Sequence, residues 1–276
     1  MNDAPSVSLH WLVVVGYASA TMLGGAGAVF RRVRLSDAAA GVLGATAMVH
    51  ALALWMRWVQ TGHGPYLGRY EAFSSHALAI AIVFLILRWR LRMPREGIAL
   101  VAPASFLMLG LGILAPAEMT YPSPAMNSLW LRIHVIMAKL ALATTVAAVA
   151  AAALLLVRAS RARRDFDAAD WKGLAEIDLL SCRCVAYVLF LMSVVILSGS
   201  LWAQAAWGSY WSWDPVETWS LAFWSGCGAA IHARGSRGWT GTRWARLVLA
   251  LGVLGIGTFV GYGHFGVSLH AAYIAP

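Results

Sequence analysis

The chain has 276 residues, of which 60% are hydrophobic and 12% charged, and its mean hydropathy is +0.69. Soluble domains carry about twice that fraction of charged residues, so the composition excludes a soluble protein and indicates a polytopic membrane protein. The net charge of +9 then concerns membrane topology, and we expect no nucleic-acid partner.

Apolar runs of about 20 residues, the length that crosses a bilayer, recur along the chain. We therefore expect an all-α, polytopic membrane bundle of about eight helices, forming a single domain over residues 1–276. The expected spans are residues 8–30, 38–60, 72–91, 96–116, 130–157, 181–203, 216–233 and 244–265. The charged stretch 158–182 is expected to be a solvated loop, with a surface helix over 168–180 as the alternative.

Basic side chains fall mainly in alternate connections between these spans. The basic-rich connections contain Arg31, Arg32, Arg34, Arg88, Arg90, Arg92, Arg95, Arg158, Arg161, Arg163, Arg164, Lys172, Arg183, Arg234, Arg237, Arg243 and Arg246. The other connections and their flanks keep only Arg57, Arg69, Arg132 and Lys139. The positive-inside rule places the first set in the cytoplasm, so both termini are expected to be extracytoplasmic. The N-terminus has no basic region, and we expect no cleaved signal peptide.

The segment WGSYWSWDPVETW, residues 207–219, is rich in aromatic rings and lies between two apolar runs on the expected outer side. An aromatic belt at a membrane interface accounts for one or two aromatic rings per span. The number of rings around this one turn is larger than a belt explains. The aromatic side chains around this turn are Trp202, Trp207, Tyr210, Trp211, Trp213, Trp219 and Trp224. Dense flat rings at a bilayer edge favour a large, flat, apolar ligand with a polar rim, such as a porphyrin, over a quinone or a lipid headgroup.

The order Asp214-Pro215-Val216-Glu217 predicts the start of a helix. Asp214 can cap free backbone N–H groups, Pro215 at the first helical position loses no needed donor, and Glu217 lies where an acidic side chain reaches back to the cap.

Histidine is the commonest axial ligand of haem iron. His134 near the outer end of the fifth span and His270 after the eighth are expected at one depth, where two imidazoles could ligate one iron. His232 lies seventeen residues after Pro215, which at 1.5 Å per residue is about 25 Å from the outer end of that helix. It is either a ligand at a second, inner site or an interfacial histidine. His264 is the main rival of His270.

The remaining candidates rank lower. His50 and His76 are lower-ranked ligands, and His10 is expected to be incidental. The three cysteines form no metal motif, so no metal other than haem iron is expected. The chain has no C-x-x-C-H motif for attaching haem to itself and no phosphate-binding loop.

Several segments together resemble the CcsA (ResC) family of system II cytochrome c biogenesis proteins. WGSYWSWDPVETW resembles the WWD signature of haem-handling membrane proteins. LRIHVIMAKL, IHARGSRGWTG and VSLHAAY resemble the segments that carry the family's first external, transmembrane and second external histidines. TGHGPYLGRYEAF resembles the first external loop, although Arg69-Tyr70-Glu71 stands where the family usually has an Asn-x-Tyr-Glu pattern.

The resemblance implies haem delivery, and presentation of haem b at the outer face for covalent attachment to apocytochrome c. The implied partners are a CcsB/ResB-type membrane protein, the CXXCH motif of apocytochrome c, and membrane lipid. His134 and His270 would be the outer ligands, and His232 one ligand of the inner site. The WWD loop, at about 202–219, would hold the ring through Trp202, Trp207, Gly208, Tyr210, Trp211, Trp213, Asp214 and Trp219.

The implied location is the bacterial cytoplasmic membrane, with the WWD loop on the periplasmic side. The chain would be the haem-handling subunit of a cytochrome c synthase. Two alternatives stay open: a non-enzymatic membrane protein that regulates or chaperones haem, and a redox subunit that passes electrons between haem and quinone.

Overall fold

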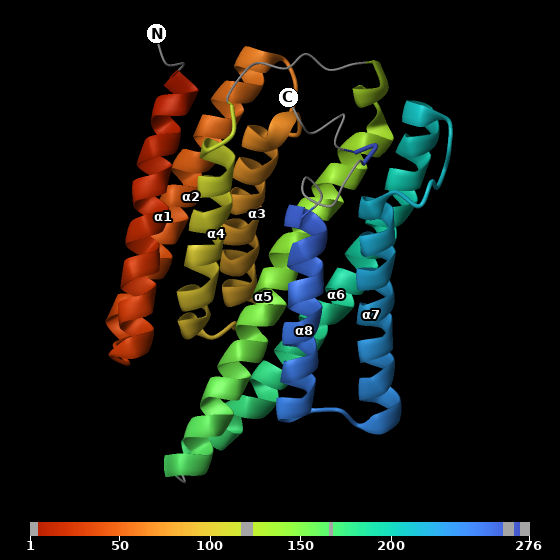
Figure 1. The fold of residues 1–276 in the computed structure, drawn as a ribbon. Coiled ribbons are helices and arrows are strands. Elements are labelled where there is room, and N and C mark those ends of the chain that lie inside the picture. Colours follow the sequence, from red (N-terminus) through yellow and green to blue (C-terminus); the bar gives the residue numbers. More distant parts are fainter. Residues whose placement is uncertain (1–4, 117–123, 166–167, 262–267, 271–276) are drawn as a thin grey trace.

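The computed structural model describes residues 5–116, 124–165, 168–261 and 268–270. These residues fold as helices and connections, without a strand among them (Figure 1). The elements are α1 (Pro5–Val29), α2 (Val33–Thr61), α3 (Gly68–Arg90), η1 (Arg95–Gly97), α4 (Ile98–Ile113), η2 (Pro124–Met126), α5 (Leu129–Asp165), α6 (Ala168–Trp207), α7 (Pro215–Arg237) and α8 (Gly241–Val260). The prediction of an all-α polytopic bundle is confirmed.

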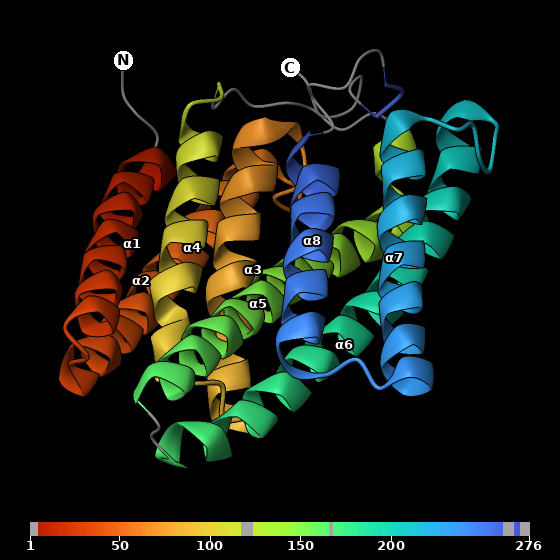
Figure 2. The ribbon, with the colours of Figure 1, turned by 60° about the horizontal axis from the view of Figure 1, so that its bottom comes forward.

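Seven of the helices in the described part of the chain are long and apolar enough to cross a membrane. The exception is α7, which carries Glu217 in its first turn and Arg234 and Arg237 in its last. It nevertheless runs alongside α8 and α6 (Figure 2). The start of α1 and the end of α8 lie at the same end of the bundle, as does the connection between α6 and α7 (Figure 1).

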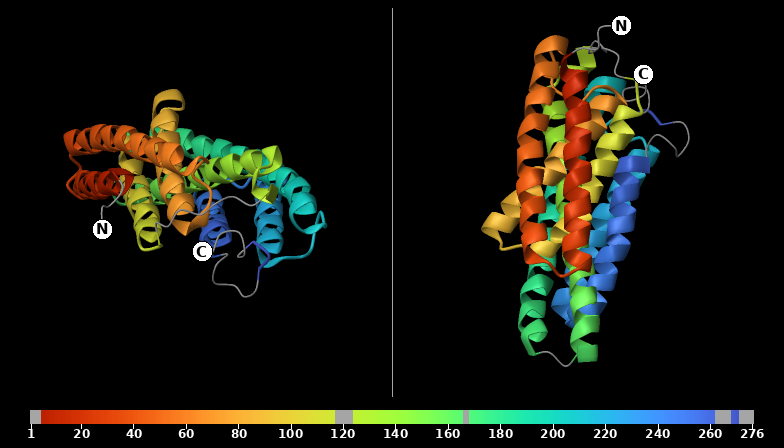
Figure 3. Two further views of the ribbon diagram at one scale, coloured as in Figure 1. Left: turned by 90° about the horizontal axis from the view of Figure 1, so that it is seen from above. Right: turned by 90° about the vertical axis from the view of Figure 1, so that its left-hand side faces the viewer.

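The bundle has two parts joined by α5. Helices α1 to α4 pack together on one side, while α6, α7 and α8 pack on the other (Figures 1 and 3). α5 contacts α3 and α4 as well as α6 and α8. Its middle is rich in buried alanine, including Ala141, Ala147 and Ala151, and small residues of this kind let membrane helices approach closely.

α5 and α6 extend well beyond the predicted spans 130–157 and 181–203, and the expected solvated loop at 158–182 is wrong. α5 continues to Asp165 and α6 begins at Ala168, so both helices extend past the other helices (Figure 3). The stretch has apolar residues that pack inward, with Ile177 and Leu180 buried. Asp178 accepts hydrogen bonds from Arg234 and from the backbone N–H of Gly241, which ties the α7–α8 connection to this extension.

Candidate functional site

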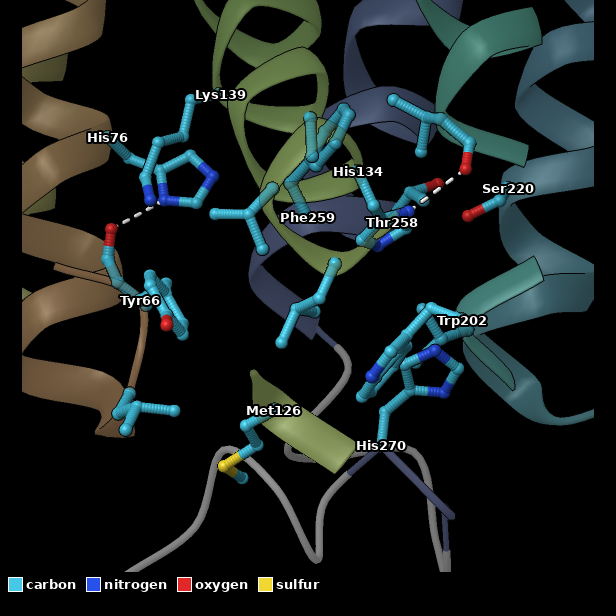
Figure 4. Close-up of a pocket in the computed structure, with 17 residues that line it drawn as sticks. Tyr66, His76, Met126, His134, Lys139, Trp202, Ser220, Thr258, Phe259 and His270 are labelled. Atoms are coloured by element: carbon cyan, nitrogen blue, oxygen red, sulfur yellow. Dashed lines mark hydrogen bonds between the residues drawn. The ribbon is translucent and has the colours of Figure 1, made fainter. Parts of the chain in front are cut away.

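A cavity of about 130 Å³, partly open to its surroundings, lies among the helices (Figure 4). α3, α5, α6 and α8 contribute to its walls together with the segment around residue 270. Its lining includes His134, His270, Trp202, His76, Lys139 and Phe259. Two histidines that the sequence places far apart therefore reach one cavity.

His134 lies in the second turn of α5 and is oriented by α6. Its Nδ1 donates a hydrogen bond to the carbonyl of Val195 at 2.9 Å. A carbonyl only accepts, so Nδ1 carries the hydrogen and the neutral ring has its lone pair on Nε2. Among the described residues nothing hydrogen-bonds to this Nε2. Histidines that bind metals are held in this way, by a second hydrogen bond from the opposite ring nitrogen.

His270 has the same arrangement, with a carboxylate in place of the carbonyl. Its Nδ1 donates to Asp214 Oδ1 at 3.1 Å, and it is 9% exposed. Within the described ranges, its Nε2 also lacks a hydrogen bond. The two histidines thus present the same ring nitrogen in the same tautomer.

Asp214 links the start of α7 to the segment that carries His270. One oxygen accepts from the N–H of Val216 at 2.9 Å, and Glu217 closes a capping box with the backbone of Asp214. The same carboxylate accepts from Ser268 Oγ at 3.0 Å and from the N–H of Leu269 at 2.7 Å. A single side chain therefore caps the helix and positions the histidine.

Burial of Asp214 by itself raises the pKa of its carboxyl group. The hydrogen bonds from His270, Val216 and Leu269 outweigh burial and lower this pKa to about 2. The carboxylate is consequently ionised at neutral pH, and it accepts the His270 Nδ1 hydrogen as a charge-assisted bond.

Trp202 and Trp207 form the aromatic part of this site. The Trp202 ring lies 6.3 Å from His134 in a stacked arrangement and 6.0 Å from His270, centroid to centroid. Trp207 is 5.2 Å from His270 and 5.1 Å from Trp202. The indole N–H of Trp202 donates to the carbonyl of Ala125 at 3.0 Å, which fixes the ring between the two imidazoles.

The other predicted members of the WWD loop lie farther out. α6 ends at Trp207, Gly208 follows with φ 78°, and α7 begins at Pro215, so both ends of the predicted 202–219 segment are helical. Tyr210 is 57% exposed and Trp213 is 69% exposed, whereas Trp202 is 3% exposed. The exposed fractions of Trp211 and Trp219 lie between these values. The rings therefore divide into an inward pair and an outward group.

The remaining histidines are dispersed. His232 is exposed near the far end of α7, His264 lies outside the described residues, and His76 lines the cavity. His50 is fully buried between α1, α2 and α3, where its Nε2 shares Ser74 Oγ with His10 at 2.9 Å each. The buried ring of His10 finds its hydrogen-bond partner in this cluster, and the expectation that His10 is incidental to function stays a prediction.

Two features of the site region were not predicted. Arg57 and Glu71 form a buried ion pair at 2.8 Å between α2 and α3. Lys139, counted only as an outer basic residue, lines the cavity and donates to the carbonyl of Pro65 at 3.0 Å. Each is a charged residue inside an otherwise apolar run, and such residues in membrane segments start as candidates for function.

These features define a class: a polytopic helical membrane protein with a cavity lined by histidine and tryptophan near one end of its bundle. The chain belongs to the cytochrome c assembly protein family, whose sequence model matches residues 39–262. The resemblance to CcsA proteins that the motifs indicated is confirmed.

The relatives carry the same description. The chain is 31% identical over 237 residues to "Cytochrome c biogenesis protein CcsA" of Chlamydomonas reinhardtii, covering 83% of this chain and 67% of that one. It is 29% identical over 281 residues to the CcsA protein of Synechococcus sp. (strain WH7803), covering 86% of both chains. The protein is thus a multi-pass membrane protein of cytochrome c biogenesis.

A solved structure, "Cytochrome c Heme Lyase CcmF", has a similar fold, with a TM-score of 0.63 at 16% sequence identity. The match covers 94% of this chain and 48% of that one, so the chain spans about half the length of the lyase. At this identity the likeness concerns the fold.

Proposed function

We propose that this chain binds haem b as a substrate at the cavity and presents it to apocytochrome c for covalent attachment. The observation that supports this most is the pair His134 and His270. Each has Nδ1 committed to an acceptor, each leaves Nε2 without a hydrogen bond among the described residues, and both contact Trp202. Neutral imidazole nitrogens are suitable axial ligands for haem iron, so this donor set fits the group.

The aromatic rings fit the porphyrin in the same way. Trp202 and Trp207 offer flat apolar surfaces beside the two imidazoles, and stacked or edge contacts between rings are favourable. The exposed Tyr210 and Trp213 lie on the outward side of the same connection. We assign this outward group to contact with the apocytochrome, whose CXXCH thiols supply the nucleophiles.

His232 serves a separate, inner site in this proposal. It is exposed on α7, and seventeen residues separate it from Pro215, or about 25 Å at 1.5 Å per residue. It does not line the cavity, and we assign the second ligand of the inner site to another chain. A CcsB/ResB-type membrane protein is the proposed source.

The basic-rich connections set the proposed orientation. They lie at the end of the bundle away from the cavity and belong in the cytoplasm by the positive-inside rule. Both ends of the chain and the WWD loop are then extracytoplasmic. In a bacterial cell this places the cavity at the periplasmic face of the cytoplasmic membrane.

Cytochrome assembly in cells tests the proposal. The chain would be produced with a CcsB/ResB-type partner and a CXXCH apocytochrome in a strain that lacks its own maturation system, and covalent haem would be measured by in-gel peroxidase staining. We expect cytochrome c with the unaltered chain and at least about a tenfold loss with His134→Ala or His270→Ala, because losing only the hydrogen bond that orients a ligand already costs about 10- to 100-fold.

Trp89→Leu is the control for Trp207→Leu. Both remove a tryptophan, but Trp89 is 73% exposed at the other end of α3, and we expect only Trp207→Leu to lower the yield. Full cytochrome c formation by both histidine variants contradicts the proposal. Haem binding without any cytochrome product indicates the non-enzymatic alternative.

A further inference from the structure

The wall of the cavity opposite His270 and Trp202 is basic. His76 of α3 and Lys139 of α5 lie side by side there (Figure 4). Neither residue belongs to the aromatic and imidazole cluster already described. The cavity therefore has one wall suited to iron and rings, and a second wall with different chemistry.

His76 is buried and incompletely hydrogen-bonded. Its Nδ1 donates to the carbonyl of Ala72 at 2.6 Å within α3, while its Nε2 is buried without a partner among the described residues. The side chain is 9% exposed, and Nε2 points toward the middle of the cavity (Figure 4). A buried polar atom left unpaired costs free energy, so this nitrogen is placed for a ligand.

Lys139 supplies the charge. It lies ten residues into α5, about 15 Å from the start of the helix. One hydrogen bond, to Pro65, is present, and no carboxylate lies within salt-bridge distance in the described part of the chain. An ammonium group in a membrane span needs an anion or a polar cavity, and two of its three N–H donors are left for one.

We propose that Lys139 and His76 bind a carboxylate of the cavity's ligand, and that this carboxylate is a haem propionate. The carboxylate accepts a hydrogen bond from the ammonium group. It shares one proton with His76 Nε2, which donates when protonated or accepts from the carboxylic acid form. The inference rests on the proposed function, since the iron-binding wall identifies the ligand that carries the carboxylate.

A neighbouring hollow offers the competing source of the same chemistry. It shares Lys139, Tyr66 and Val135 with the cavity and is also lined by Arg132 and the exposed Trp55 and Trp58. An acidic lipid seated there would use Lys139 together with Arg132. Haem seated in the cavity would use Lys139 together with His76. The two sources therefore predict different partners for Lys139.

The test compares haem with its dimethyl ester, in which both propionates are neutral. Binding to the purified, detergent-solubilised chain would be measured by absorption titration. We expect the unaltered chain to bind haem roughly 10- to 100-fold more tightly than the ester, the range for a lost hydrogen bond to a charged group. Lys139→Met should remove most of this preference and His76→Leu part of it.

Lys139→Arg should retain the preference, which separates loss of charge from loss of fold. Arg132→Gln is the matched control, because it removes a charge on the same helix outside the cavity. The preference of this variant for haem over the ester should be unchanged.

Equal binding of haem and ester by the unaltered chain overturns this inference alone. The inference is also overturned if Arg132→Gln loses the preference for haem over its ester and native mass spectrometry shows that Lys139→Met and Arg132→Gln have both lost a bound acidic lipid. That result assigns the carboxylate site to lipid. Failure of the unaltered chain to bind either compound overturns the proposed function as well.

Discussion

Asp214 has two tasks, one in capping α7 and one at the candidate ligand His270. As the N-cap of α7 it accepts from Val216, and beside the candidate ligand it accepts from His270, Ser268 and Leu269. The cap belongs to the local sequence, whereas the bond to His270 joins residues 56 positions apart. The geometry of the candidate ligand is therefore coupled to the start of the helix.

Replacing Asp214 with serine separates these tasks. A serine hydroxyl can still cap α7, but it is neutral and sits on a shorter side chain. It also lacks the second oxygen that holds the backbone of Leu269, so it cannot replace the charge-assisted bond to His270. We expect the helix to form and haem affinity to fall about 10- to 100-fold, the usual effect of removing the group that hydrogen-bonds to a ligand and orients it. Absorption titration measures the affinity, and circular dichroism the helix.

Glu217→Gln is the control for this change. Glu217 accepts from Ser212 and Asp214 and does not touch His270. We expect haem affinity to stay within about twofold, since the amide oxygen can still accept these bonds. An equal loss in both variants would mean that loop order alone, rather than the bond to His270, determines affinity.

At the scale of helices, the close contact between α5 and α6 positions His134. Gly199 of α6 faces the imidazole, and a Cβ there would lie 2.7 Å from His134 Nδ1 and 2.9 Å from Cε1. Since real Cβ contacts essentially never fall below 3.0 Å, alanine at 199 must displace the ring from the Val195 carbonyl.

Gly199→Ala is expected to weaken haem binding by about tenfold or more, because His134 loses the hydrogen bond that orients it, while the helix itself gains from alanine. Gly228→Ala in α7 is the matched control, because its nearest neighbouring atom is Leu189 Cδ1 at 3.9 Å, an ordinary contact. The haem absorption maximum and affinity of the two variants would be compared. An unshifted spectrum in Gly199→Ala would show that His134 tolerates the displacement.

The helices themselves could largely be predicted, because membrane spans follow from hydropathy and the start of α7 from four consecutive residues. The lengths of α5 and α6 could not, since a charged stretch beyond the bilayer has the same composition in a helix or a loop. The pairing of His134 with Val195, and of His10 and His50 through Ser74, depends on packing between distant residues. The histidines and tryptophans of the sequence indicated the candidate site. Which of their rings face inward could not be predicted, because that depends on how the helices pack.

For the whole molecule, the buried ion pair between Arg57 and Glu71 joins α2 to α3 beside the site. Its side chains are 5% and 3% exposed, and Glu71 also accepts from the N–H of Leu67 at 3.2 Å. Leu67 lines the cavity. This pair therefore links the stability of the α1–α4 part of the bundle to one wall of the site.

Removing the carboxylate with Glu71→Ala leaves a buried guanidinium without its ion-pair partner, which costs about 3–5 kcal/mol. We expect a marked fall in the melting temperature of the purified protein. Asp37→Asn is the control: its partners Arg88 and Arg95 are 27% and 42% exposed, and exposed pairs contribute about 0–1 kcal/mol. Similar melting temperatures for the two variants would show that the buried pair contributes little.

The account depends on His134 and His270 supplying nitrogen ligands to one haem iron. Electron paramagnetic resonance of the purified, haem-loaded protein reports those ligands directly. We predict a low-spin signal typical of two histidines in the unaltered chain, and its loss in both His134→Ala and His270→Ala but not in the Trp89→Leu control. The same low-spin signal in both histidine variants would contradict the account.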